Sequence, residues 1–175
     1  EVVRRLWKVI VGARRHVELL FPQFRDDRYG ELPDELVFVH AEEVLDRYPG
    51  LSPREREVAL TRDYPAVFMM GLGHPLRDGR PHELRAADYD DWVTETTQGE
   101  TPARHGLNGD ILVWNPVTRH SHELTSMGIR VTKEALVRQL EMSGLMEDLQ
   151  LPYHQAIMND AVPLSIGGGI GQIQA

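Results

Sequence analysis

Two carboxylates interrupt apolar segments in the stretch from residue 106 to residue 130, which reads GLNGDILVWNPVTRHSHELTSMGIR. Asp110 begins the first segment, residues 110–116, and Glu123 lies within the second, residues 120–130, with a short turn between them. Both segments have the composition of strands, so the stretch predicts an antiparallel hairpin. A carboxylate is costly to bury unless it is paired, hydrogen-bonded or holding a cation, so each carboxylate marks a candidate site.

The alternation of side chains along a strand predicts which groups of the hairpin lie together. The residues expected to share a face on each strand are Asp110, Leu112 and Trp114 on the first, and Ser121, Glu123 and Thr125 on the second. An antiparallel sheet with one solvated face would carry the same acidic and hydroxyl groups without any function. The pattern alone leaves both interpretations open.

A second charged segment, residues 85–92, reads RAADYDDW. Its one arginine, Arg85, precedes the three aspartates Asp88, Asp90 and Asp91. A solvated charge cluster would account for this composition, since Asp and Arg side chains are mostly exposed. A zwitterionic amino acid would also suit it, because an α-carboxylate needs a guanidinium and an ammonium needs an acid. Composition alone does not distinguish between these two interpretations.

Helices and strands are predicted around these segments. Apolar residues recur at helical spacing over residues 1–20, which predicts an amphipathic helix ending near Pro22. Ser52, Pro53 and Glu55 form a capping box with proline at the first helical position, and Thr132 is expected to cap a later helix.

The strands predicted before the hairpin are the apolar runs at residues 36–40 and 66–70. Glycines and prolines of residues 71–82 predict a long turn joining two antiparallel strands. Residues 94–104 are expected to form a polar loop beside the site. His40, at the end of the first run, is expected to be structural.

Four segments of the chain together resemble one family of enzymes. They are VFVHAEEVLDRYPGL (residues 37–51), RAADYDDW (85–92), GLNGDILVWNP with HELTSMGIRV (within 106–131) and IGGGIGQ (166–172). In this order they resemble the ammonia-dependent asparagine synthetases, or aspartate–ammonia ligases, which are similar in fold to the catalytic domains of class II aminoacyl-tRNA synthetases. The segments and the stretches between them cover nearly the whole chain.

The resemblance implies an α+β fold with a mainly antiparallel β-sheet flanked by helices, as a single partial catalytic domain over residues 1–175. Family members are longer at the N-terminus, where a dimer-forming helix and strand and an arginine for the α-phosphate of ATP are expected. The family's later ATP-binding arginine has no counterpart after Gln172, which an internal gap in the sequence would explain. The chain is therefore expected to be the C-terminal half of a homodimeric enzyme, and marginal or inactive by itself.

The resemblance also implies a reaction. An aspartate–ammonia ligase joins aspartate and ammonia into asparagine through a β-aspartyl-adenylate, with ATP as co-substrate and AMP and pyrophosphate as products. The expected cofactor is Mg²⁺, bound by Glu123 and Asp110 through the oxygen ligands that a hard cation requires. Thr125 stands where the family has serine and keeps the hydroxyl.

Each candidate site residue receives a role from the resemblance. The residues expected to contact ATP are Asp110, Glu123, Leu124, Thr125, Gly167, Gly168 and Gly169. Those expected to contact aspartate are Arg85, Asp90, Ser126 and Arg130. Those expected to act in catalysis are Asp90, Arg130 and Glu123. Asp90 is the candidate to hold ammonium and accept its proton. The glycines are expected to let adenine and ribose approach a strand closely.

Composition limits the possible partners. The 175 residues contain 19 Lys and Arg against 27 Asp and Glu, a formal net charge of −8, which argues against a nucleic-acid partner. No cysteine is present, so disulfides and thiolate metal sites are excluded. No apolar run could span a membrane and no signal peptide is evident, so a cytoplasmic location is expected.

Three other interpretations remain open. The first is a paralogue or fragment that binds aspartate or adenylate without turnover. The second is a metal-binding module on His120 and His122, whose imidazoles would share a strand face, although no third ligand has suitable spacing. The third is a tRNA-charging enzyme, which the acidic composition and the absence of an anticodon-binding module oppose.

Overall fold

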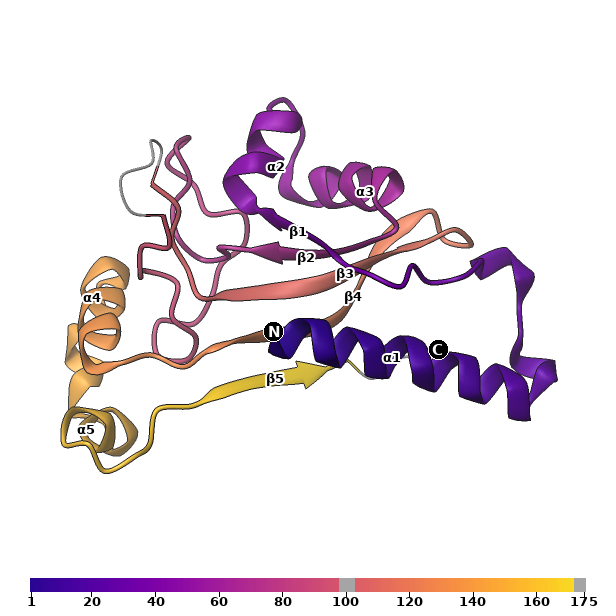
Figure 1. Cartoon of the computed structure of the whole chain (residues 1–175). Coiled ribbons are helices and arrows are strands. Elements are labelled where there is room, and N and C mark those ends of the chain that lie inside the picture. The colour runs from indigo at the N-terminus through magenta and orange to yellow at the C-terminus, as the bar shows by residue number, and fades with distance from the viewer. Residues whose placement is uncertain (98–102, 172–175) are drawn as a thin grey trace.

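A five-stranded sheet forms the centre of the computed structural model, which describes residues 1–97 and 103–171 (Figure 1). The strands lie in chain order: β1 (Val37–His40), β2 (Ala66–Met70), β3 (Asn108–Asn115), β4 (His120–Ile129) and β5 (Ile166–Ile170). β1 and β2 are parallel, and every later neighbour is antiparallel. The predicted α+β class, with a mainly antiparallel sheet, is confirmed.

Helices cover both faces of this sheet. α1 (Val2–Leu20) lies along one face, and α2 (Ala41–Arg47) and α3 (Pro53–Asp63) lie along the other, while α4 (Lys133–Ser143) and α5 (Pro152–Met158) pack at one end (Figure 1). The short 3-10 helices of the described chain are Pro22–Phe24, Asp27–Tyr29 and Met146–Gln150. None of the described helices is long and apolar enough to cross a membrane.

Successive side chains along a strand point to opposite faces of the sheet, so the core is divided into two halves. On β2, Phe68 packs with Trp7 of α1, whereas its neighbour Val67 packs with Leu60 of α3. On β3, Ile111 and Leu112 divide in the same way. A third cluster lies under α4 and includes Trp92 from the segment that follows Arg85. The sheet is thus held from both sides, and the third cluster anchors the connection that carries the site.

The predicted helix starts are confirmed by their hydrogen bonds. Glu55 Oε2 accepts from the backbone N–H of Ser52 at 2.9 Å, and Thr132 Oγ1 accepts from that of Ala135 at 3.2 Å. His40 is structural as predicted, because its Nδ1 accepts from the N–H of Glu42 at 3.2 Å and so caps α2.

A β-bulge changes the predicted faces of the hairpin. Ile111 pairs with Thr125 and Leu112 pairs with Glu123, so Leu124 is an extra residue on β4. Beyond the bulge, Ser126 takes the position opposite Asp110. The prediction that Thr125 shares a face with Glu123 is therefore wrong: Thr125 lies opposite Ile111, on the side of α1, and is buried.

The connection between β2 and β3 is longer than the predicted turn. Residues 71–82 are only its first part, and the chain reaches β3 at residue 108 after passing through the charged segment 85–92. The predicted polar loop at residues 94–104 falls partly on residues 98–102, which lie outside the described residues. Within the described part, the backbone of residues 85–92 forms an isolated bridge between Asp90 and Arg130, the residue after β4.

Candidate active site

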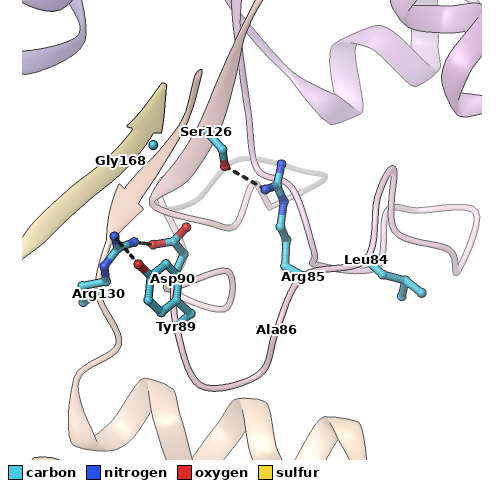
Figure 2. A pocket seen from close by; sticks show the side chains of 9 residues that line it. Leu84, Arg85, Ala86, Tyr89, Asp90, Ser126, Arg130 and Gly168 are labelled. Carbon is cyan, nitrogen blue, oxygen red and sulfur yellow. Dashed lines mark hydrogen bonds and ion pairs between the residues drawn. The ribbon is translucent and has the colours of Figure 1, made fainter. Parts of the chain in front are cut away.

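An open pocket of about 470 Å³ lies where the connection after β2 meets β4 and β5 (Figure 2). Its lining consists of Leu84, Arg85, Ala86, Tyr89, Asp90, Ser126, Arg130, Gly168 and Gly169. The four residues predicted to contact aspartate are all among them, together with two of the three glycines predicted to contact ATP. The fold therefore brings together residues from the segment 85–92, from the end of the hairpin and from the glycine strand β5.

Arg130 and Asp90 form an ion pair within this pocket. Their side chains are 16% and 8% exposed. Burial raises the pKa of the Asp90 carboxyl above its ordinary value, and the positive charge of Arg130 opposes that rise. The pair places one cation and one anion at the pocket wall, as recognition of a zwitterion requires.

Tyr89 also contacts the guanidinium of Arg130. Its hydroxyl oxygen lies 3.0 Å from Arg130 Nη2, and the guanidinium carbon lies 3.8 Å from the centre of its ring (Figure 2). Sequence reasoning missed this residue, although its position next to Asp90 was a signal. Stacking and hydrogen bonding together fix the plane of the guanidinium.

Two glycines on neighbouring strands make room for the Asp90–Arg130 pair. Gly128 of β4 is paired with Gly167 of β5. A Cβ atom on Gly128 would lie 2.6 Å from the Asp90 carboxyl carbon, and one on Gly167 would lie 2.9 Å from Arg130 Cζ. Both distances are too short for real contacts, so a Cβ atom at either position would displace the member of the pair that lies against it.

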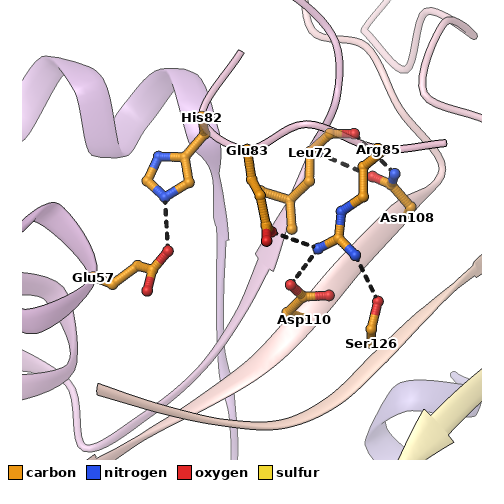
Figure 3. A network of polar contacts seen from close by, with 8 residues as sticks. All are labelled: Glu57, Leu72, His82, Glu83, Arg85, Asn108, Asp110 and Ser126. Carbon is orange, nitrogen blue, oxygen red and sulfur yellow. Dashed lines mark hydrogen bonds and ion pairs between the residues drawn. The ribbon is translucent and has the colours of Figure 1, made fainter. Parts of the chain in front are cut away.

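Arg85 is the centre of a second polar network (Figure 3). Its Nη1 donates to Ser126 Oγ at 2.8 Å, and its Nη2 contacts both Asp110 and, at 2.9 Å, Glu83. Burial raises the pKa of Asp110 to about 6, Arg85 opposes the rise, and the charge of Glu123 adds to it. Among the described residues, Asp110 Oδ1 and Arg85 Nε are buried without a hydrogen-bond partner. Such atoms are rare in a folded protein and mark places where a ligand can complete the network.

The other two aspartates of the charged segment have structural partners. Asp91 is 1% exposed, and its Oδ1 accepts from the backbone N–H groups of Val93 at 3.0 Å and Thr94 at 2.9 Å. Asp88 lies 3.0 Å from His154 Nε2. Of the three aspartates, Asp90 alone is in the lining of the pocket.

Two histidines stack in the connection between β2 and β3, and the burial of one of them should make the stability of the protein depend on pH. His74 stacks on His105 with ring centres 3.9 Å apart. Burial lowers the pKa of His74 to about 4, and the positive charges of His105, Arg138 and His40 add to this effect. An unfolded histidine binds a proton below its ordinary pKa of 6.5, whereas the folded one binds it only near pH 4. The free energy of unfolding is therefore largest above pH 6.5 and falls as the pH drops toward 4.

We expect this histidine to lower the free energy of unfolding by on the order of 2 kcal/mol between neutral and acidic pH, less than the full pKa shift implies, because solvent screens the half-buried ring. Urea unfolding at both pH values checks it, with His74→Gln as the variant and the exposed His120→Gln as the control. The wild type and the control should lose more stability on acidification than His74→Gln. Equal losses in all three proteins would contradict the prediction.

A family model described as aspartate–ammonia ligase matches residues 1–175. The chain belongs to the aspartate–ammonia ligase family. This match confirms the resemblance that the four sequence segments indicate. By family, the chain is a ligase.

Solved structures show the same fold at low sequence identity. Asparaginyl-tRNA synthetase from Pyrococcus horikoshii, complexed with asparaginyl-adenylate, matches with a TM-score of 0.58 and 16% identity over 95% of this chain and 38% of that one. Asparaginyl-tRNA synthetase from Entamoeba histolytica matches with a TM-score of 0.59 and 13% identity over 95% and 38%. Aspartyl-tRNA synthetase from the same organism matches with a TM-score of 0.59 and 15% identity over 97% and 34%. The family member described here thus has a class II synthetase-like fold and spans well under half of those chains.

The remaining predicted ATP and metal residues of this aspartate–ammonia ligase family member lie along the hairpin, apart from Gly167 on β5, and Asp110 is absent from the pocket lining. Glu123 is exposed, on the face of Asp110, and is absent from the pocket lining, as are Leu124 and Thr125. Thr125 is 1% exposed, and its Oγ1 has no hydrogen-bond partner among the described residues. Gly167 lies against Arg130.

The residues present fit the binding of Mg²⁺ by two carboxylates. Among residues 1–97 and 103–171, no three His, Asp or Glu side chains are grouped closely enough to hold a metal by themselves. Mg²⁺ usually binds through one or two carboxylates together with substrate phosphates, and Asp110 Oδ1 is a buried oxygen without a partner. The alternative metal site on His120 and His122 gains no third ligand in the described part of the chain.

Proposed function

We propose that this protein makes asparagine from aspartate and ammonia through a β-aspartyl-adenylate, consuming ATP and releasing AMP and pyrophosphate. The observation that carries the proposal is the pocket itself, where the Asp90–Arg130 and Arg85–Ser126 pairs meet beside β4 and β5 of a class II synthetase-like sheet. Membership of the aspartate–ammonia ligase family supports the same reaction. We further propose a homodimer in the cytoplasm, without a nucleic-acid partner, as the working form.

Aspartate would be held by its charges. The guanidinium groups of Arg130 and Arg85 would take its two carboxylates, and Ser126 would donate or accept a hydrogen bond beside Arg85. Asp90 would face the ammonium group of the substrate or the incoming ammonia. Because Tyr89 and Asp90 hold Arg130 in a fixed plane, little reorganisation is required when the substrate arrives.

The nucleotide would lie along β4 and β5. Gly167, Gly168 and Gly169 carry no side chains of their own, which would let a base and a ribose approach the strand, most freely at Gly169, where an added Cβ atom would meet nothing within 4 Å. Leu124 and Thr125 would contribute backbone contacts from the bulge, because their side chains lie on the α1 side of the sheet. Asp110 and Glu123 would hold Mg²⁺, which when bound neutralises charge on the phosphate oxygens.

The reaction would occur in two steps. An oxygen of the aspartate β-carboxylate attacks the α-phosphorus of ATP, and pyrophosphate leaves. Ammonia then attacks the activated carbonyl carbon, AMP leaves, and a proton of the attacking nitrogen passes to a carboxylate oxygen of Asp90. Arg130 would stabilise a carboxylate of the substrate in both steps. Glu123 would act indirectly, by helping to hold the Mg²⁺ that neutralises the nucleotide phosphates.

The test is aspartate-dependent exchange of pyrophosphate into ATP, followed by asparagine formation with ammonia, for the product of the whole gene and for residues 1–175 side by side. We expect the gene product to show exchange that vanishes without aspartate, and asparagine and AMP in equal amounts. Asparagine binding or aspartate binding without any exchange would overturn the proposal in favour of a protein that binds without turnover.

A further inference from the structure

The side chain of Glu83 binds the Arg85 guanidinium, which is also the group proposed to bind a carboxylate of the substrate. Its Oε2 accepts from Arg85 Nη2 at 2.9 Å, and the same nitrogen contacts Asp110 (Figure 3). One guanidinium nitrogen is thus shared between two acids, while the positive charge of Arg85 faces two negative charges. An incoming carboxylate meets a cation that is already neutralised.

The two acids differ in how easily they can give up Arg85. The Asp110 side chain is 3% exposed and lies on β3, whereas the Glu83 side chain is 49% exposed in a segment without helix or strand. The residue after Glu83, Leu84, is 84% exposed, whereas the residue before it, His82, is buried and lies 3.1 Å from Glu57, so the chain is open to solvent on the Leu84 side of Glu83. Water can replace Arg85 as the partner of Glu83 at small cost, but Asp110 has no access to water.

Arg85 itself is held in place. Its side chain is 18% exposed, and its stem packs so closely on the backbone that a Cβ atom on Gly73 would lie 3.0 Å from Arg85 Cβ. Nη1 keeps its bond to Ser126 on the pocket side. The mobile member of the network is therefore Glu83, not the arginine.

We propose that Glu83 is an internal competitor of aspartate, whose carboxylate neutralises Arg85 in the empty pocket and is displaced when a substrate carboxylate binds. This inference rests on the proposed function, since it assigns a carboxylate substrate to Arg85. Glu83 touches no reacting atom and sets affinity through Arg85. The presence of Glu83 therefore raises the aspartate concentration at which half of the pockets are occupied.

Replacing the charge tests the competition. Glu83→Gln keeps the size of the side chain but removes its charge, so aspartate should bind about two- to fivefold more tightly, the range for an ion pair of this exposure. The dissociation constant of L-aspartate is measured by calorimetry, and KM should fall by the same factor with kcat unchanged. The difference should shrink at high salt, because salt screens an exposed charge. The control is Glu147→Gln, which removes the same charge from an exposed position outside the pocket.

The outcomes separate the two proposals. Unchanged or weaker aspartate binding in a folded Glu83→Gln variant would overturn the competition and leave the proposed function standing, because the wild type would still form asparagine. Equal tightening in Glu147→Gln would also overturn it, since the effect would then come from net charge. Failure of the wild type to bind aspartate at all would overturn both.

Discussion

Replacing Arg130 by lysine is expected to lower kcat/KM for aspartate about a hundredfold, which corresponds to ~3 kcal/mol of lost transition-state binding. Lysine keeps the charge but has a single donor centre, so it cannot pair with Asp90 and a substrate carboxylate while stacking on Tyr89. Aspartate-dependent pyrophosphate exchange measures the loss. KM should rise more than kcat falls, because Arg130 binds the substrate before and during the reaction.

Lysine is the variant of choice because it leaves the fold intact. A neutral residue would leave Asp90, 8% exposed, without its cation, and breaking a buried pair in this way costs about 3–5 kcal/mol of stability. The matched control is Arg62→Lys, an exposed arginine at the end of α3. Wild-type kinetics in Arg130→Lys would remove Arg130 from the proposed aspartate site.

The second large effect is expected for Gly128→Ala. The new Cβ would lie 2.6 Å from the Asp90 carboxyl carbon and 2.9 Å from Asn108 Cβ, so the Asp90 carboxylate must leave its present position, in which it pairs with Arg130. Asparagine formation should fall at least tenfold, and the free energy of unfolding should drop by about 1–3 kcal/mol, as for other overpacked sites. Product assay and urea unfolding of the same preparation measure both quantities.

Gly50→Ala provides the comparison for that variant. A Cβ atom at Gly50 would meet nothing within 4 Å, so the same chemical change should alter neither activity nor stability appreciably. An active, fully stable Gly128→Ala protein would show that the Asp90–Arg130 pair tolerates displacement, and the proposed role of its geometry would fail.

Much of the fold was predictable because local signals agree with it. The capping groups at Ser52 and Thr132 act within one helical turn, so their sequence is enough to identify them. The apolar run at residues 66–70 matches β2 residue for residue, because a strand between two helical layers must be apolar on both faces. The residues proposed for aspartate were found through the resemblance to a family, and they meet in one pocket.

The structure itself decided which groups face one another. No local feature of the sequence marks Leu124 as the extra residue of β4, yet this bulge puts Ser126 opposite Asp110 and turns Thr125 toward α1. Tyr89 became a partner of Arg130 only through the bridge between the segment 85–92 and the end of β4.

The sequence by itself determined the helix starts, because capping is a local property, and it indicated the family through four segments that resemble it, with the α+β class that this resemblance implies. The tertiary structure alone decided that Gly128 and Gly167 pair under Asp90 and Arg130 and that Glu83 competes for position at Arg85. These relations depend on strand register and on how a long connection folds back over the sheet. Both are set by the packing of the whole chain, and no short stretch of residues contains that information.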